Sequence, residues 1–166
     1  MLLIKNKKIE NPVYNLLITY LHNCCDVATF SLCDFHEGFD AYESRMEELF
    51  AASSLNKFII RKYWDSEYCN SVSGYSYEIY VVSLSKETIR FFMLGLGLYN
   101  WLFPYLPEDL CFYRNGKCFL ESISHERICR IYSDDEHIKA MLRKIGLNFF
   151  ELPDEEPPTL KYTLMY

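Results

Sequence analysis

The sequence lacks the motifs that mark the common nucleotide-binding and zinc-binding folds. No G-x-x-x-x-G-K-[ST] stretch occurs, and Gly95-Leu-Gly97 does not belong to a G-x-G-x-x-G that follows a strand. ATP and NAD are therefore not expected as ligands. The seven cysteines include no C-x₂-C pair with a second half, which excludes the usual structural zinc sites. We interpret them as reduced thiols that act as small apolar residues.

Groups of possible metal ligands are scarce. Two local groups have suitable residue types: His22 with Cys24 and Cys25, and His36 with Asp34 and Glu37. The first group ends a predicted helix, where its side chains point in different directions. The second group has no His-x-x-His or Glu-x-x-His partner. We expect no metal and no other cofactor.

Positive charge is also sparse. The formal net charge is −6 at pH 7, and the only basic cluster consists of Lys5, Lys7 and Lys8. Because phosphate neutralisation needs clustered lysines and arginines, nucleic acid is not expected as a partner. Lys5 interrupts the apolar start of the chain and no small-residue cleavage site follows, so we expect no signal peptide. The longest uncharged run, 91–107, contains glycines and prolines and is too short to span a membrane. These features predict a cytoplasmic protein without a membrane partner.

What the sequence does contain indicates one globular domain. Its 166 residues are sufficient for one core, and 50% of them are apolar while 24% are charged. No repeat or linker divides the chain. The order of predicted elements favours a single α+β domain over residues 1–166, with a mostly antiparallel sheet and three to four packed helices. Its two halves, about 1–84 and 85–166, are expected to pack as two layers that share one sheet.

The clearest local signal is a hairpin within a β-meander over about 110–132. Asn115-Gly116 lies between two apolar runs, and this dipeptide tolerates the positive φ angles of a type I′ turn. The turn places Arg114 opposite Lys117, Tyr113 opposite Cys118, and Phe112 opposite Phe119. A third strand over 127–132 follows the short loop at Ser124.

Hydrophobic periodicity and capping residues predict the other elements. Strands are expected at 2–5, at the edge of the sheet, and at 27–33, 58–64, 75–84, 147–152 and 160–166. Helices are expected after Asn11-Pro12, over about 39–50, after Ser85, and after the capping box that begins at Ser133. Gly146 stands where that last helix should stop.

Two carboxylate-rich stretches are candidates for binding a partner. The candidate residues are Asp34, Glu37, Asp40, Glu43, Glu47 and Glu48 in the first stretch and Asp154, Glu155 and Glu156 in the second. Such a run is commonly a solvated helix face. The alternative is an acidic surface that recognises a basic protein, with aromatic anchors at Trp64 and Tyr63 or at Trp101 and Tyr105.

A catalytic alternative centres on His125. A carboxylate from Glu126 or Asp109 would orient the imidazole as a general base, and the loops that carry these residues border one meander. The candidate nucleophiles are Cys111, Cys118, Ser122 and Ser124. None lies in a G-x-S-x-G or papain-like context, so His125 also fits a purely structural role in a turn.

The C-terminal portion of the chain resembles a known class of proteins. The loop Leu106-Pro-Glu-Asp-Leu110, Gly116 and His125-Glu126, followed by a capped helix and the IGLNFFE strand, are similar to small bacterial immunity-type proteins encoded beside polymorphic or contact-dependent toxins. The resemblance implies a protein that binds and neutralises a cognate toxin. The acidic charge favours a basic nuclease, whose active site an acidic, aromatic surface would cover. A phage-encoded inhibitor of a host defence protein is an alternative, because it would bind its partner through the same kind of acidic, aromatic surface. The sequence does not indicate the oligomeric state.

Overall fold

The computed structural model describes residues 1–33, 39–55, 59–64 and 77–160, with backbone alone at 33, 39, 59–64, 77 and 78. The α-helices in this part of the chain are α1 (Val13–Cys24), α2 (Phe39–Ala52), α3 (Ile89–Phe92) and α4 (Glu136–Lys144). The strands are β1 (Leu2–Ile4), β2 (Val27–Cys33), β3 (Ile59–Trp64), β4 (Tyr77–Ser83), β5 (Glu108–Arg114), β6 (Lys117–Ile123), β7 (Ile128–Ile131) and β8 (Phe149–Glu151). Two short 3₁₀ helices, Met93–Gly95 and Leu98–Asn100, follow α3.

These strands form one antiparallel sheet in the order β3-β4-β2-β5-β6-β7-β1-β8. The predicted α+β class with a mainly antiparallel sheet is confirmed. Strands from the two sides of residue 84 are neighbours in this order: β2 pairs with β5, and β1 lies between β7 and β8. The two halves of the chain therefore share one sheet and its core.

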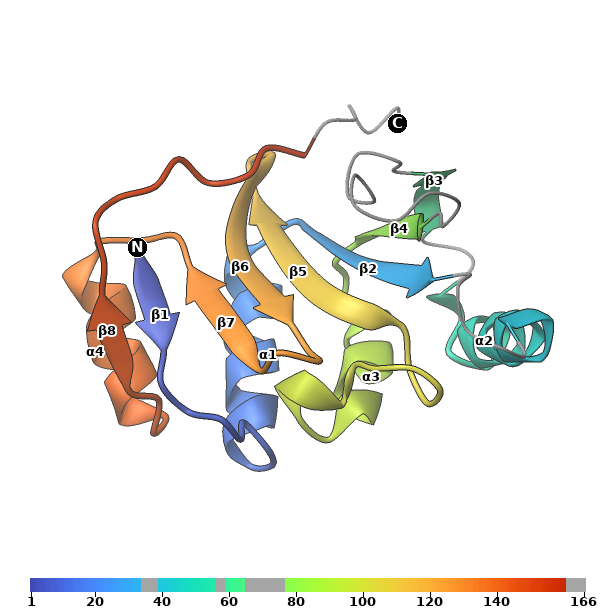
Figure 1. Ribbon diagram of the computed structural model, residues 1–166, viewed down its shortest axis with the longest axis horizontal. Helices are drawn as coiled ribbons and strands as arrows, with labels where there is room; N and C mark the ends of the chain where they lie inside the picture. The colour runs from blue at the N-terminus through green and yellow to red at the C-terminus, as the bar shows by residue number, and fades with distance from the viewer. Residues whose placement is uncertain (34–38, 56–58, 65–76, 161–166) are drawn as a thin grey trace.

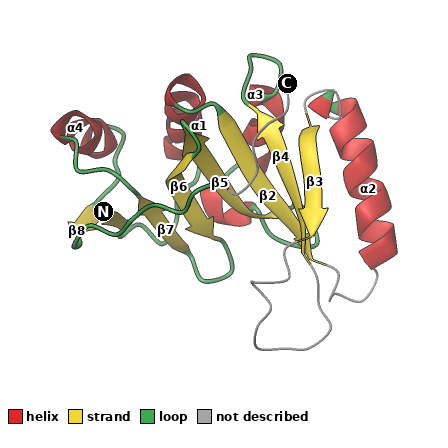
Figure 2. Ribbon diagram, turned by 90° about the horizontal axis from the view of Figure 1, so that it is seen from above, coloured by secondary structure: helices red, strands yellow, loops and turns green. Residues whose placement is uncertain are grey.

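The two faces of the sheet follow from the strand registers. One row of paired positions runs Val82, Ala28, Phe112, Leu120, Ile131 and Leu2. These six side chains are at most 1% exposed, so this face carries the core. Helices α1, α3 and α4 cover it: they lie behind the sheet in Figure 1 and above it in Figure 2. Helix α2 packs at the β3–β4 end, where Phe50 contacts the rings of Phe30 and Tyr80.

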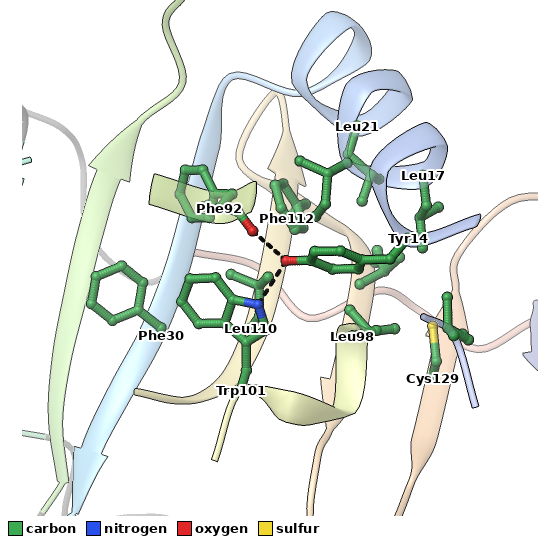
Figure 3. Packing of buried hydrophobic residues seen from close by; sticks show 14 of the residues in the cluster. Tyr14, Leu17, Leu21, Phe30, Phe92, Leu98, Trp101, Leu110, Phe112 and Cys129 are labelled. Carbon is green, nitrogen blue, oxygen red and sulfur yellow. Dashed lines mark hydrogen bonds between the residues drawn. The ribbon is translucent and has the colours of Figure 1, made fainter. Parts of the chain in front are cut away.

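An aromatic cluster fills the space between the sheet and the helices. Trp101 lies 5.3 Å from Phe91 and 5.8 Å from Phe92, measured between ring centroids. Its indole Nε1 donates a hydrogen bond of 2.7 Å to the Tyr14 hydroxyl, which itself donates to the Phe92 carbonyl oxygen (Figure 3). Tyr14 and Trp101 are fully buried, so these hydrogen bonds satisfy polar groups that water cannot reach.

The predicted hairpin and meander are present as β5, β6 and β7. Asn115 and Gly116 have φ angles of 52° and 75°, as the turn prediction requires. Arg114 faces Lys117 and Tyr113 faces Cys118, as expected. The third predicted pair is wrong because a β-bulge intervenes: Phe112 faces Leu120.

Other elements differ from the predictions at their ends. The 2–5 strand is present as β1 but is internal, since β8 pairs with its outer side and forms the edge. Asn11 does not cap α1: the helix starts at Val13 with Pro12 in the cap position and no side-chain cap. The expected strand at 160–166 lies almost wholly outside the described residues, although Thr159 forms a β-bridge with Lys117.

The helix predicted after Ser85 is short. Ser85 is not its N-cap: Ser85 Oγ accepts hydrogen bonds from the backbone of Glu87 and Thr88, but the N-cap position of α3 is Thr88, and the α-helical part ends at Phe92. Leu96, which follows the first 3₁₀ helix, has a φ angle of 52° and is 61% exposed. Among the described residues, no helix combines the length and apolar character needed to cross a bilayer.

Candidate functional site

The first candidate site is the outer face of α2. The inner face of this helix is apolar because Tyr42, Met46 and Phe50 repeat at helical spacing, and each is at most 4% exposed. Tyr42 also fixes the helix to the loop before β5 by donating a 2.8 Å hydrogen bond to the Leu106 carbonyl oxygen. The polar side of α2 must therefore face away from the sheet, and Figure 2 shows the helix at the end of the molecule beside β3.

Three carboxylates extend from this outer face into solvent. Asp40, Glu47 and Glu48 occupy positions i, i+7 and i+8 of one helix and are exposed. None of them forms a salt bridge with a described residue. Arg45, the one basic residue of α2, lies over the Tyr42 ring at 5.7 Å from its centroid. The negative charge of this face is thus not paired within the described structure.

Glu43 differs from these three carboxylates because it is half-buried. Burial raises the pKa of the nearby Tyr80 hydroxyl, and the negative charges of Glu43 and Glu47 raise it further. The Tyr80 phenol is therefore held neutral beneath the acidic face. Asp34 and Glu37, the first two predicted binding residues, lie outside the described residues.

The second acidic stretch lies far from the first. Asp154, Glu155 and Glu156 are exposed on the segment that follows β8. Asp154 Oδ1 lies 3.0 Å from the N-terminal amino group, which anchors this segment beside β1. The segment starts at β8, at the end of the sheet opposite α2 in both views, and runs toward β6, where Thr159 forms a β-bridge with Lys117 (Figures 1 and 2). The structure therefore does not combine the two stretches into one surface.

The predicted aromatic anchors are only partly available. Trp101 is fully buried in the core, so the prediction that it anchors a partner is wrong. Tyr105 is 77% exposed and remains accessible. The side chains of Tyr63 and Trp64 are outside the described structure.

The second candidate site is formed by Glu108, Asp109 and His125. Glu108 and Asp109 begin β5, and His125 lies in the turn between β6 and β7. Because β5 and β6 are antiparallel, the start of β5 and the end of β6 lie at the same end of the strands, at the bottom of Figure 1. One ligand-type atom from each side chain lies within 4.8 Å of the other two. Glu126 Oε1 lies 3.7 Å from His125 Nε2, and both side chains are more than half exposed. The convergence expected from the hairpin is therefore present.

Asp109 connects the strand to the turn. Its φ angle is 54°, a left-handed conformation, and its Oδ1 accepts a 3.0 Å hydrogen bond from the Ser124 amide. Burial raises the pKa of the Asp109 carboxyl group. The Ser124 amide hydrogen bond opposes this shift, the charge of Glu108 adds to it, and the charge of His125 opposes it.

The predicted nucleophiles surround this cluster unequally. Ser122 Oγ donates to the Leu110 carbonyl oxygen at 2.8 Å and is buried, and Cys118 is also buried. Cys111 is half-buried, and its Sγ lies 3.5 Å from the Asp109 carbonyl oxygen. Ser124 is 2% exposed, and its hydroxyl oxygen has no hydrogen-bond partner among the described residues.

Sequence reasoning missed a shallow hollow on the second face of the sheet. It has a volume of about 640 Å³, and its lining includes Leu3, Ile128, Phe150 and Arg130. Arg130 Nη1 is already paired with Glu121 Oε2 at 2.8 Å. The apolar residues of β1 and β8 follow one another without alternation, so the sequence does not show which of them face this hollow, and only the pairing of the two strands places Leu3 beside Phe150.

Comparison with protein-family models, with curated proteins and with solved structures gives no match to this chain.

Proposed function

We propose that the protein is an immunity-type binding protein that neutralises a cognate toxin by placing the outer face of α2 against a basic surface of that toxin. The observation that carries the proposal is the set of exposed carboxylates at Asp40, Glu47 and Glu48, which have no salt bridge with described residues. Unpaired charge of one sign on a rigid helix attracts an oppositely charged partner and rejects partners of like charge.

Three features support this use of the helix. The carboxylates project from an element that Tyr42, Met46 and Phe50 fix to the core, so the charges are held in a defined geometry. The net charge of −6 extends the attraction beyond the contact itself. A basic nuclease has the required complementary surface because its substrate groove binds phosphates.

The experiment is affinity capture with the full chain from cells of its source, followed by binding kinetics with the captured protein. We expect the triple variant Asp40→Lys, Glu47→Lys, Glu48→Lys to lower the association rate constant by about tenfold or more. We also expect its association to depend less on salt concentration. The wild-type chain should inhibit the activity of the captured protein, and the triple variant should inhibit it less.

A matched control variant has the same change in net charge at other sites. Glu10→Lys, Glu87→Lys, Asp134→Lys reverses three exposed carboxylates that lie outside α2. If both triple variants slow association equally, or neither does, α2 is not the contact surface. Capture of a partner whose activity the wild-type chain leaves unchanged would contradict neutralisation, and capture of a host defence protein would favour the phage-inhibitor alternative.

A second candidate function is a small hydrolase or transferase that uses His125 with Asp109 or Glu126. The convergence of Glu108, Asp109 and His125 favours it, because a carboxylate beside an imidazole can orient a general base. Hydrolysis of an activated ester such as p-nitrophenyl acetate, measured for the wild-type chain and His125→Ala, tests this candidate. Turnover that falls to the rate of the buffer in the variant supports it, whereas equal rates for both proteins exclude it.

A further inference from the structure

We infer that Glu108, Asp109 and His125 form a binding site for a first-row divalent metal ion of the Mn²⁺ or Zn²⁺ type. This site goes beyond the proposed function, because it lies where β5 begins and β6 turns into β7, and not on α2. It also goes beyond the sequence, which shows no spacing typical of a metal site.

The geometry of the three side chains is that of a small ligand set. Each contributes one atom, and these atoms lie within 4.8 Å of one another. Ligand atoms on a common ion lie roughly 3 to 4.5 Å apart, since each metal–ligand bond is about 2.0–2.2 Å long. The His125 side chain is 57% exposed and can rotate toward the two carboxylates, so only a small adjustment is needed.

An independent observation comes from the buried hydroxyl of Ser124. This residue is 2% exposed, and its Oγ has no hydrogen-bond partner among the described residues. Its amide donates to Asp109 Oδ1, and the next residue in the chain is His125, so Ser124 connects two of the proposed ligands. A buried hydroxyl is rarely left without a partner, and a water molecule on a bound ion would supply one.

The charges at the site favour a cation. One carboxylate oxygen of Glu108 and one of Asp109 lie within 4.8 Å of each other and of an imidazole nitrogen of His125. A divalent ion would compensate both carboxylates at once.

The donor atoms also select the type of ion. One imidazole nitrogen with two carboxylates is a mixed set that suits Mn²⁺ and Zn²⁺, whereas Mg²⁺ and Ca²⁺ prefer oxygen ligands alone. Mn²⁺ is the better probe because Zn²⁺ also binds thiols, and the chain has seven cysteines.

The test is a titration of the chelator-treated full chain with Mn²⁺, followed by electron paramagnetic resonance of the free ion. We expect saturation at one Mn²⁺ per chain and a rise in the thermal unfolding midpoint on binding. His125→Ala and Asp109→Asn should each weaken binding by about tenfold or more. His137→Ala, which removes an exposed histidine of α4, is the matched control and should leave the affinity unchanged.

Far-ultraviolet circular dichroism checks that each variant is folded, and the exposed His125 can be replaced without disturbing the core. The proposal is overturned if the wild-type chain binds no Mn²⁺ at millimolar concentration. It is also overturned if His125→Ala binds as tightly as the wild type, or if His137→Ala weakens binding as much. Competition by equimolar Mg²⁺ would contradict the assigned role of the imidazole nitrogen. Because the toxin-binding experiment uses α2 variants, either proposal can fail without the other.

Discussion

At the scale of single residues, the Tyr14 hydroxyl organises the centre of the core. It donates to the Phe92 carbonyl oxygen and accepts from Trp101 Nε1 at 2.7 Å, so one oxygen joins α1, α3 and the chain before β5. Gly95 allows this arrangement: a Cβ atom there would lie 2.9 Å from the Tyr14 hydroxyl and closer still to Trp101 Nε1. Glycine disfavours a helix, but at position 95 the absence of a side chain lets Trp101 and Tyr14 approach the backbone.

We predict that Tyr14→Phe destabilises the protein by about 1–3 kcal/mol, because the Trp101 indole N–H and the Phe92 carbonyl group lose their partner in a dry environment. The change in the free energy of unfolding can be measured by urea denaturation. Tyr105→Phe is the control, since the Tyr105 side chain is 77% exposed, and we expect it to change stability by less than about 0.5 kcal/mol. Equal stability of Tyr14→Phe and the wild type would show that water reaches these groups.

Asp109 gives a prediction about pH. Burial raises the pKa of its carboxyl group in the folded protein, so between the unfolded and folded pKa values the folded state keeps a proton that the unfolded state has lost. The contribution of Asp109 to stability therefore falls as pH rises through this interval. We predict that Asp109→Asn, measured with a chelator present, gains stability relative to the wild type as the pH rises above the ordinary aspartate pKa of about 4. Asp134→Asn reports the effect of removing an exposed aspartate, and parallel curves for all three proteins would contradict the prediction.

At the scale of elements, local sequence patterns predict structure wherever the deciding contacts are also local. Residues 27–33 were predicted as a strand and form β2 with the same bounds, and Asn115-Gly116 makes the expected turn. The patterns fail where distant contacts decide. The position of β1 between β7 and β8 depends on pairing with residues more than a hundred positions away in the chain, which no local periodicity encodes.

The same distinction applies to the candidate sites. The convergence of Asp109 with His125 could be inferred, because the hairpin places the start of β5, with Asp109, beside the end of β6, where the turn with His125 begins. The burial of Trp101 and the separation of the two acidic stretches could not, since both depend on how the helices and the C-terminal segment lie on the sheet.

Helix α4 gives a prediction at this scale. Its predicted cap, Ser133, lies before the helix, and the observed N-cap is Asp135, whose Oδ1 accepts a 2.8 Å hydrogen bond from the His137 amide. We predict that Asp135→Ala costs about 0.5–2 kcal/mol of stability, measured by urea denaturation. Asp134→Ala removes a neighbouring exposed carboxylate and is the control. A greater loss in Asp134→Ala than in Asp135→Ala would contradict this assignment of the cap.

At the scale of the whole molecule, the sheet order makes the two halves of the chain interdependent. Within the sheet, the two halves meet at three strand pairings: β2 pairs with β5, and β1 pairs with both β7 and β8. The buried core is also continuous, from Phe50 and Tyr80 at one end to Ile138 and Leu142 at the other. Separating the halves would expose both strand edges and core side chains.

We therefore predict a single cooperative unfolding transition. Far-ultraviolet circular dichroism reports the whole sheet, and the resonances of the Leu2 and Val82 methyl groups report β1 and β4, the strands next to its two edges; all three should show the same urea midpoint. The fragments 1–84 and 85–166, produced separately, should not fold. In the sheet, β5, β6 and β7 separate the β2 and β1 strands of the first fragment, and β1 separates the β7 and β8 strands of the second. Two separate midpoints, or a folded 85–166 fragment, would mean that the meander with α4 is stable without β1 and β2, and that the shared sheet contributes little to the stability of either half.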